Sequence, residues 1–266
     1  MKKEILIVLS VVLVVVIVGC GLWLAYYTVD SQHQKQTYET LAKDFLLEEP
    51  KSSLSLAEED SPEQASTTQE SVVTLTTAPP RHDLAALRAE NSDCVGWLTI
   101  PDTTVDYPVV WTPADPEHYL RRDFYGNSAS GGTPFLDGRN EAQAMGQNLI
   151  VYGHNMLDGS MFKLVLQYLT PNFRQTHQDI YLELNGTQYH YQVLAALETN
   201  TRSPVYAYTD LSGAAEMEDF RSMLLEETGL DAIPQAEGYL TLSTCNDQGG
   251  NSRVLVVAVL AGEVTR

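Results

Sequence analysis

The chain has 266 residues, of which 35 are Asp or Glu and 16 are Lys or Arg, so its formal net charge at pH 7 is −19. A surface this acidic repels phosphate backbones, which excludes nucleic acid as an expected partner. Three cysteines are too few for a disulfide framework, and the chain beyond the N-terminal part has the length of one domain with its own core.

The N-terminal segment is long enough to cross a membrane. Residues 5–27 are almost entirely apolar, and about 20 such residues span a bilayer as a helix. Lys2 and Lys3 precede the stretch, so the positive-inside rule places the N-terminus in the cytoplasm and the rest of the chain outside. The stretch exceeds a signal-peptide core and no A-x-A-like site follows it, which favours residues 1–27 as an uncleaved anchor. The alternative is lipidation at Cys20, since residues 17–20 fit a loose lipoprotein-processing pattern.

Residues 28–80 are interpreted as a tether between this anchor and the domain at 81–266. Residues 30–47 are polar with scattered apolar positions, which is compatible with an extension of the helix into solvent. Residues 48–80 are rich in Glu, Ser, Thr and Ala and lack the apolar periodicity of a core segment. They are predicted to form a disordered stalk that gives the domain reach.

The domain itself is predicted to be mainly β. A short helix is expected at 84–91, and apolar-rich runs predict strands at 95–100, 105–111, 133–136, 148–152, 179–184, 188–198, 239–245 and 253–261. Eight short strands favour a closed barrel, which leaves no sheet edge exposed. Two further stretches, 159–169 and 210–227, have helical apolar spacing, and Asp158 is a candidate cap for the first.

Two strand ends carry a thiol and a guanidinium. Cys245 closes the run 239–245 and Arg253 opens the run 253–260, and the loop between them contains two glycines. This pattern predicts a hairpin-like connection with both side chains on one rim. A thiolate can form beside a fixed positive charge, and an oxyanion can be held there.

A third strand end carries a histidine. The run 148–152 stops at Gly153, which places His154 in a turn, and histidine is the natural proton carrier for a cysteine nucleophile. Together Cys245, His154 and Arg253 form an acyl-transfer set, in which the thiol attacks a carbonyl, the imidazole protonates the leaving amine and the guanidinium stabilises the oxyanion. The remaining candidate partner for Cys245, Cys94, is interpreted as a half-buried structural residue at the start of the first strand.

These residues carry a resemblance to the sortases, the cysteine transpeptidases of Gram-positive cell surfaces. Residues 241–245 with Arg253, and residues 152–155, resemble the catalytic segments of the family. Three further segments, 91–100, 105–110 and 132–137, resemble class B sortases in particular. The resemblance covers about 81–263 and implies an eight-stranded sortase barrel with an N-terminal helix and a helix between strands six and seven, where 210–227 lies.

The resemblance also implies an activity. The enzyme would cleave a C-terminal sorting signal of a secreted protein, of the form Asn-Pro-x-Thr followed by Asn or Gly, through a thioester on Cys245. It would pass the acyl group to an amine of a cell-wall precursor or of a pilin. Leu120, Tyr152 and Ser243 match the substrate groove of the family, although each also suits barrel packing or a backbone hydrogen bond. Pro116 and Asn246 replace an Asn and an acidic residue of the family pattern, which leaves the exact motif open.

Two other functions compete with this interpretation. A hydrolytic cysteine peptidase would use the same thiol and imidazole, but a papain-like order places Cys before His, whereas here His154 precedes Cys245. A non-catalytic surface binding module would leave the coincidence of three reactive residues at strand ends unexplained. No pair of histidines has metal-ligand spacing with nearby Cys or carboxylates, so we expect no metal and no cofactor. The sequence leaves open whether the resting pair is thiolate with imidazolium or neutral.

Overall fold

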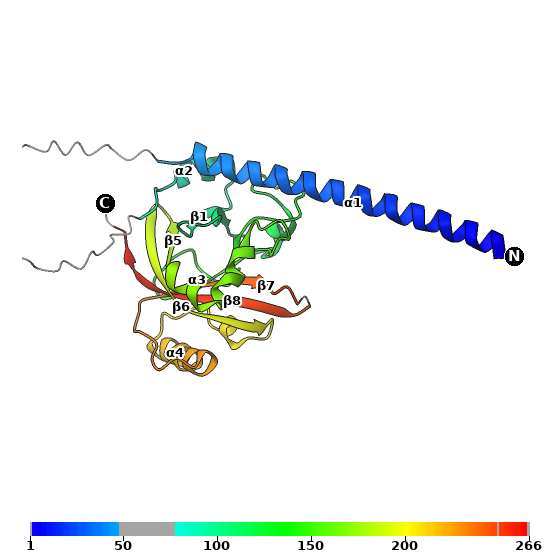
Figure 1. The fold of residues 1–266 in the computed structure, drawn as a ribbon. Helices are drawn as coiled ribbons and strands as arrows, with labels where there is room; N and C mark the ends of the chain where they lie inside the picture. The colour runs from blue at the N-terminus through cyan, green and yellow to red at the C-terminus, as the bar shows by residue number, and fades with distance from the viewer. Residues whose placement is uncertain (1, 48–77, 249, 265–266) are drawn as a thin grey trace, which may run out of the picture.

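Eight strands close into a barrel in the order β1-β2-β3-β4-β7-β8-β6-β5 (Figure 1). The computed structural model describes residues 2–47, 78–248 and 250–264, so most of the predicted stalk lies outside the described residues. The pairs β2–β3 and β4–β7 are parallel and the other neighbours are antiparallel. The strands are β1 Cys94–Thr99, β2 Asp106–Val110, β3 Phe135–Leu136, β4 Asn148–Tyr152, β5 Asp179–Leu184, β6 Thr187–Asn200, β7 Tyr239–Cys245 and β8 Ser252–Glu263. The predicted eight-stranded closed barrel is confirmed.

The barrel is filled by its own side chains, as small barrels are. Trp97, Leu98 and Val256 belong to one core and are fully buried. A second, smaller cluster covers the outer face of the sheet, where Phe220 packs with Tyr239 and Val257. Since strand β8 faces a core on both sides, its residues 254–260 are buried without alternation.

Besides the N-terminal helix, the described residues form three α-helices on the outside of the barrel. Helix α2 spans Leu84–Glu90 and begins where the Asp83 carboxylate accepts a hydrogen bond from the Ala86 amide, as an N-cap does. Helix α3 spans Pro171–Thr176. Helix α4 spans Ala214–Thr228, lies between β6 and β7 as predicted, and ends at Gly229 in the left-handed conformation. Short 3₁₀ helices are η1 His118–Arg121, η2 Phe162–Leu169 and η3 Pro204–Ala207.

The stretch 159–169 does contain a helix, as predicted, but the helix begins only at Phe162. Its residues form the 3₁₀ helix η2, whose buried side chains Phe162, Val165 and Tyr168 are three residues apart, the repeat of a 3₁₀ helix. Asp158 is not its cap, because that carboxylate accepts from the Ser160 amide within the preceding turn. Mixed three- and four-residue apolar spacing fits both kinds of helix, so the pattern could not separate them.

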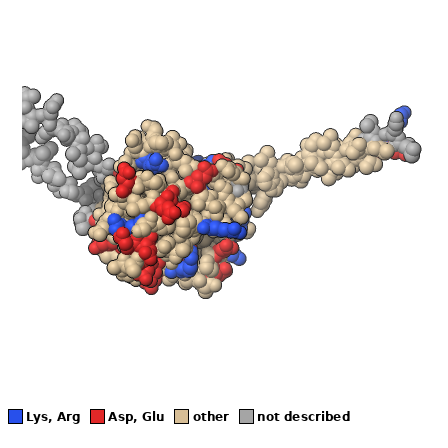
Figure 2. Space-filling model, turned by 90° about the horizontal axis from the view of Figure 1, so that it is seen from below, with Lys and Arg blue, Asp and Glu red and all other residues tan. Residues whose placement is uncertain are grey.

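The longest element is the N-terminal helix α1, Lys2–Asp44. Within the described chain it is the one helix long and apolar enough to span a membrane. Its first half projects beyond the barrel (Figure 1), and it is bare of Lys, Arg, Asp and Glu except near its tip (Figure 2). The domain beside it carries both signs of charge interspersed on the face that Figure 2 shows.

The second half of α1 packs against the barrel and does not extend into solvent. Ser31, Gln34, Tyr38 and Leu41 are buried at helical spacing, so one stripe of the helix faces the domain. The chain leaving α1 is also fixed, since the Leu47 amide donates to the Arg81 carbonyl over 2.8 Å.

Candidate active site

The parallel pairing of β4 with β7 brings His154 and Cys245 to one rim of the barrel. Tyr152 is the register partner of Ser243. Beyond that pair, the Gly153 amide donates to the Ser243 carbonyl over 3.1 Å, and the Thr244 hydroxyl donates to the Gly153 carbonyl over 2.8 Å. Parallel strands end on the same side of a sheet. His154, which follows Gly153 at the end of β4, therefore lies at the same rim as Cys245 at the end of β7.

Arg253 comes to the same rim from the other neighbour of β7. Strands β7 and β8 are antiparallel, and Cys245 is paired directly with Arg253. The Asn246 amide donates to the Ser252 carbonyl and closes the connection above the pair. The Arg253 guanidinium donates to the carbonyls of Gly250 and Ser252, at 3.2 and 2.9 Å, which fixes its direction.

A groove of about 560 Å³ joins these three residues. The three residues predicted to bind substrate, Leu120, Tyr152 and Ser243, also line it. All six predicted site residues are therefore brought together. Other lining residues are Pro116, Glu117, Phe135, Asp137, Gly138, Arg139, Gly153, Thr201, Tyr206 and Thr244.

The imidazole of His154 is held through one of its nitrogens. Its Nε2 lies 2.7 Å from the Leu120 carbonyl oxygen, and a carbonyl only accepts, so Nε2 carries the proton. Burial lowers the pKa of His154 below its usual range, the nearby charge of Arg121 adds to this, and the hydrogen bond to Leu120 partly offsets it. Burial therefore favours the neutral ring, in which Nδ1 is the basic nitrogen.

Asn155 ties the loop that carries His154 to the end of β7. Its side-chain amide donates to the Cys245 carbonyl over 3.0 Å and to the Asp247 carboxylate over 2.8 Å. Lys163 also contacts Asp247, at 2.6 Å. These contacts lower the pKa of Asp247, with the hydrogen bond from Lys163 the largest cause.

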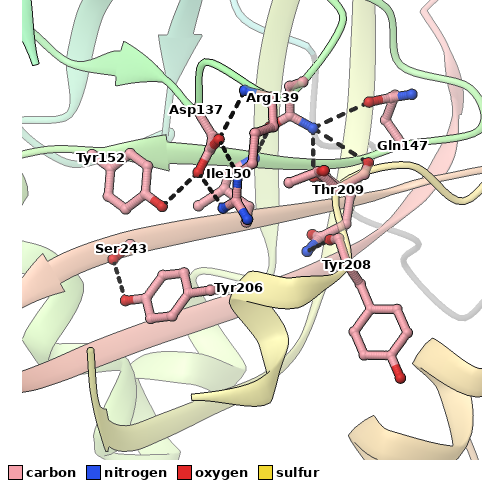
Figure 3. Close-up of polar contacts among 11 residues, drawn as sticks. Asp137, Arg139, Gln147, Ile150, Tyr152, Tyr206, Tyr208, Thr209 and Ser243 are labelled. Atoms are coloured by element: carbon pink, nitrogen blue, oxygen red, sulfur yellow. Dashed lines mark hydrogen bonds and ion pairs between the residues drawn. The ribbon is translucent and has the colours of Figure 1, made fainter. Parts of the chain in front are cut away.

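A polar group that the sequence did not identify lies along the groove (Figure 3). Arg139 donates through Nε and a terminal nitrogen to both carboxylate oxygens of Asp137, and the Tyr152 hydroxyl donates to the same carboxylate over 2.8 Å. Burial alone would raise the pKa of Asp137, but the hydrogen bonds from Arg139 and Tyr152 outweigh it and the pKa is lowered. Asp137 lies in the segment 132–137, one of the motifs quoted above, and that motif is the sequence signal that could have identified it.

Ser243 has a partner that the sequence also missed. Tyr206, in the 3₁₀ helix η3, places its hydroxyl 2.8 Å from the Ser243 hydroxyl (Figure 3). The Tyr206 ring stacks on that of Tyr152, with 6.2 Å between centroids. One wall of the groove is therefore aromatic, with hydroxyl groups along it.

The other cysteines differ from Cys245. Cys94 is at the start of β1 as expected but is fully buried, and burial raises the pKa of its thiol to about 12. It is not paired with Cys245, and Cys20 lies exposed on α1. Among residues 2–47, 78–248 and 250–264, no group of three His, Cys, Asp or Glu side chains could hold a metal ion.

Comparison with known proteins agrees with this geometry. The family model of the sortase domain matches residues 98–261. Sortase B of Listeria monocytogenes is 33% identical over 68% of this chain and 74% of its own length. Sortase B of Staphylococcus aureus is 26% identical over 96% of both chains. The solved Staphylococcus aureus sortase B–substrate complex superimposes with a TM-score of 0.61 at 29% identity, covering 68% of this chain and 85% of that one.

Proposed function

Because the chain belongs to the sortase family of cysteine transpeptidases, as a class B member, we propose that Cys245, His154 and Arg253 carry out its acyl transfer. The observation that supports this assignment most is their convergence on one groove from three different strand ends. The substrate is a sorting signal of the Asn-Pro-x-Thr type, and the acceptor is an amine of a cell-wall precursor or of a pilin.

The first half-reaction forms a thioester. The Cys245 sulfur attacks the Thr carbonyl carbon of the signal, and the peptide C–N bond breaks as the tetrahedral intermediate collapses. The thiol proton passes to Nδ1 of His154 as the sulfur attacks, and the departing amine then takes that proton from the imidazolium. In this assignment Nδ1 exchanges the proton, because Nε2 is held by the Leu120 carbonyl.

The second half-reaction reverses the proton flow. An incoming amine attacks the thioester carbon and gives a proton to His154. The C–S bond breaks, and the released Cys245 thiolate takes that proton back from the imidazolium. Both tetrahedral intermediates carry a negative oxygen, which Arg253 stabilises with oriented N–H donors. Since this charge develops only in the transition state, the contact accelerates the chemical step.

The groove beyond Cys245 would hold the signal. Leu120, Tyr152 and Ser243 are proposed to contact it, in a groove that offers aromatic rings and hydroxyl groups. Pro116 also lines this groove, at the position where the family pattern has Asn. A peptide panel that varies one position of the signal at a time identifies the motif.

The proposed site of action is the outer face of a membrane. The exposed first half of α1 supports a single-pass anchor, with Lys3 on the cytoplasmic side and the catalytic domain outside. Intact-mass analysis of protein extracted from membranes tests this, since a chain that starts at a lipidated Cys20 would contradict it.

The activity is tested by product mass. The full chain is incubated with a fluorogenic Asn-Pro-x-Thr-type peptide, with and without triglycine, and Cys245→Ala serves as the inactive control. We expect a ligated product whose share rises with triglycine concentration. Hydrolysed product alone at every triglycine concentration would identify the protein as a peptidase. Activity that survives in Cys245→Ala would refute the assignment of the nucleophile.

A further inference from the structure

The buried stripe of α1 contacts two loops of the barrel. Ser31, Gln34 and Tyr38 are 7%, 4% and 2% exposed. Their partners lie at residues 131–133, before strand β3, and at Asp158, in the loop that follows His154. Polar side chains this buried define the position of the helix, because a displaced helix would leave their hydrogen bonds unmade.

The first loop supports the acceptor of His154. The Tyr38 hydroxyl donates to the Gly132 carbonyl over 2.7 Å, and Gln34 accepts from the Gly131 amide over 3.0 Å. Gly132 has φ +60°, and a Cβ there would lie 2.6 Å from the Leu120 carbonyl oxygen. That oxygen is the one that holds Nε2 of His154.

The second loop supports the backbone of His154. The Tyr107 ring packs edge-on against that of Tyr38, and the Tyr107 hydroxyl accepts from the Met161 amide over 3.2 Å. The next amide, that of Phe162, donates to the His154 carbonyl over 2.8 Å. Ser31 donates to Asp158 in the same loop. Both the ring and the main chain of His154 are thus connected to α1 by short series of contacts.

We propose that the docked half of α1 is a positioning element for His154, with Tyr38 as its central positioning residue. The inference rests on the proposed role of His154 as proton carrier. Proton transfer requires heavy atoms within hydrogen-bond reach, and a misplacement of about 1 Å can cost ~10²-fold in rate. A helix that enters from the membrane therefore sets the geometry of a catalytic group that it does not touch.

The test uses the full chain in nanodiscs. Tyr38→Phe removes one hydroxyl and keeps the ring against Tyr107, while Gln34→Leu removes the acceptor of the Gly131 amide. Tyr191→Phe is the matched control, since its hydroxyl is fully buried and makes no hydrogen bond within the described residues. We expect Tyr38→Phe to lower kcat by ~10-fold with KM nearly unchanged. Combining it with Gln34→Leu should increase the loss, whereas Tyr191→Phe should leave kcat unchanged.

A second readout follows the imidazole directly. In ¹H–¹⁵N NMR the Nε2 proton of His154, protected by the Leu120 carbonyl, should give a slowly exchanging signal that Tyr38→Phe broadens and Tyr191→Phe leaves unchanged. Unchanged kcat and an unchanged signal in Tyr38→Phe would overturn the proposal, as would equal losses in Tyr191→Phe. Full ligation activity in His154→Ala would overturn the proposed function instead, and the NMR comparison would still decide whether α1 positions the ring.

Discussion

Cys245 and Arg253 are direct cross-strand partners at the open end of the β7–β8 ladder. Side chains of directly opposed residues lie on the same face of a sheet, about 5 Å apart at Cβ. The hydrogen-bonded ladder of β7 and β8 fixes this pairing. The thiol and the guanidinium therefore keep their relative position without bonding to each other. The two carbonyls that Arg253 contacts, those of Gly250 and Ser252, orient the guanidinium further.

Arg253→Lys should lower kcat/KM by about 10²-fold, the typical loss of one oxyanion donor. Lysine keeps the charge but loses the planar fork that serves the backbone carbonyls and an oxyanion together. Steady-state kinetics of peptide cleavage with triglycine measure the loss, and Arg202→Lys, at an exposed position, is the control. Full activity of Arg253→Lys would mean that charge alone is sufficient.

His154 should titrate below pH 6.5, the ordinary value for histidine, because burial lowers its pKa. Between the lowered folded pKa and 6.5 the unfolded chain binds more protons than the folded chain. The contribution of His154 to stability is therefore complete above pH 6.5 and is lost as the pH falls through this window. NMR titration of the ring in Cys245→Ala measures the midpoint directly.

Arg121→Gln should raise that midpoint toward the ordinary value, since the Arg121 charge is one cause of the lowered pKa of His154. Lys43→Gln, which removes an exposed cation of α1, should leave it unchanged. A midpoint at or above 6.5 in the parent chain would contradict the burial of the ring.

Asn155→Asp should lower kcat/KM by about tenfold, the equivalent of ~1.4 kcal/mol, which is in the range of one hydrogen bond. Aspartate keeps the size of the side chain but cannot donate to the Cys245 carbonyl, and it places a like charge beside Asp247. Lys163→Met serves as the control, because it removes a contact to Asp247 and leaves the Cys245 contact in place. Equal losses in both variants would assign the effect to Asp247.

Glu183→Ala should destabilise the fold by about 3–5 kcal/mol, the cost of removing one member of a buried pair. The Glu183 carboxylate accepts from both the backbone and the ring of His82, the two side chains are 2% and 3% exposed, and the ring stacks on Trp97. Asp179→Ala breaks the more exposed pair with His190 and should cost ~1 kcal/mol or less. Denaturant titration of both variants in detergent compares them, and similar losses would argue against a special role for the buried pair.

The sequence was sufficient for the barrel because its strands, several of them buried on both faces, stand out as short apolar-rich runs. Strands β4, β5 and β7 have the predicted bounds, and Cys245, His154 and Arg253 could be placed together because each stands at a strand end. The proposed catalytic set was thus visible in local patterns.

The missed features depend on polar residues that tertiary contacts bury. Ser31 and Gln34 resemble solvent-exposed helix positions in sequence, so the docked stripe of α1 gave no apolar period. The contact of Arg139 with Asp137 likewise requires the turn that follows β3. Hydrophobic patterns identify a core, but they do not predict which polar groups will be buried and hydrogen-bonded within it.

The hydrogen bond from Leu47 to Arg81 joins the two ends of the stretch between them, and the Asp83 amide donates to the Phe45 carbonyl beside it. Because the two ends of this stretch are held together, its length does not change the distance between α1 and the domain. With α1 as the proposed anchor, Ser31 follows Tyr27 by four residues, or about 6 Å of helix at 1.5 Å per residue. Lengthening or cutting the chain between Leu47 and Arg81 should therefore leave the groove at the same distance from the membrane. With α1 as the anchor, the groove would keep a fixed distance from the membrane, and substrates would have to come to it.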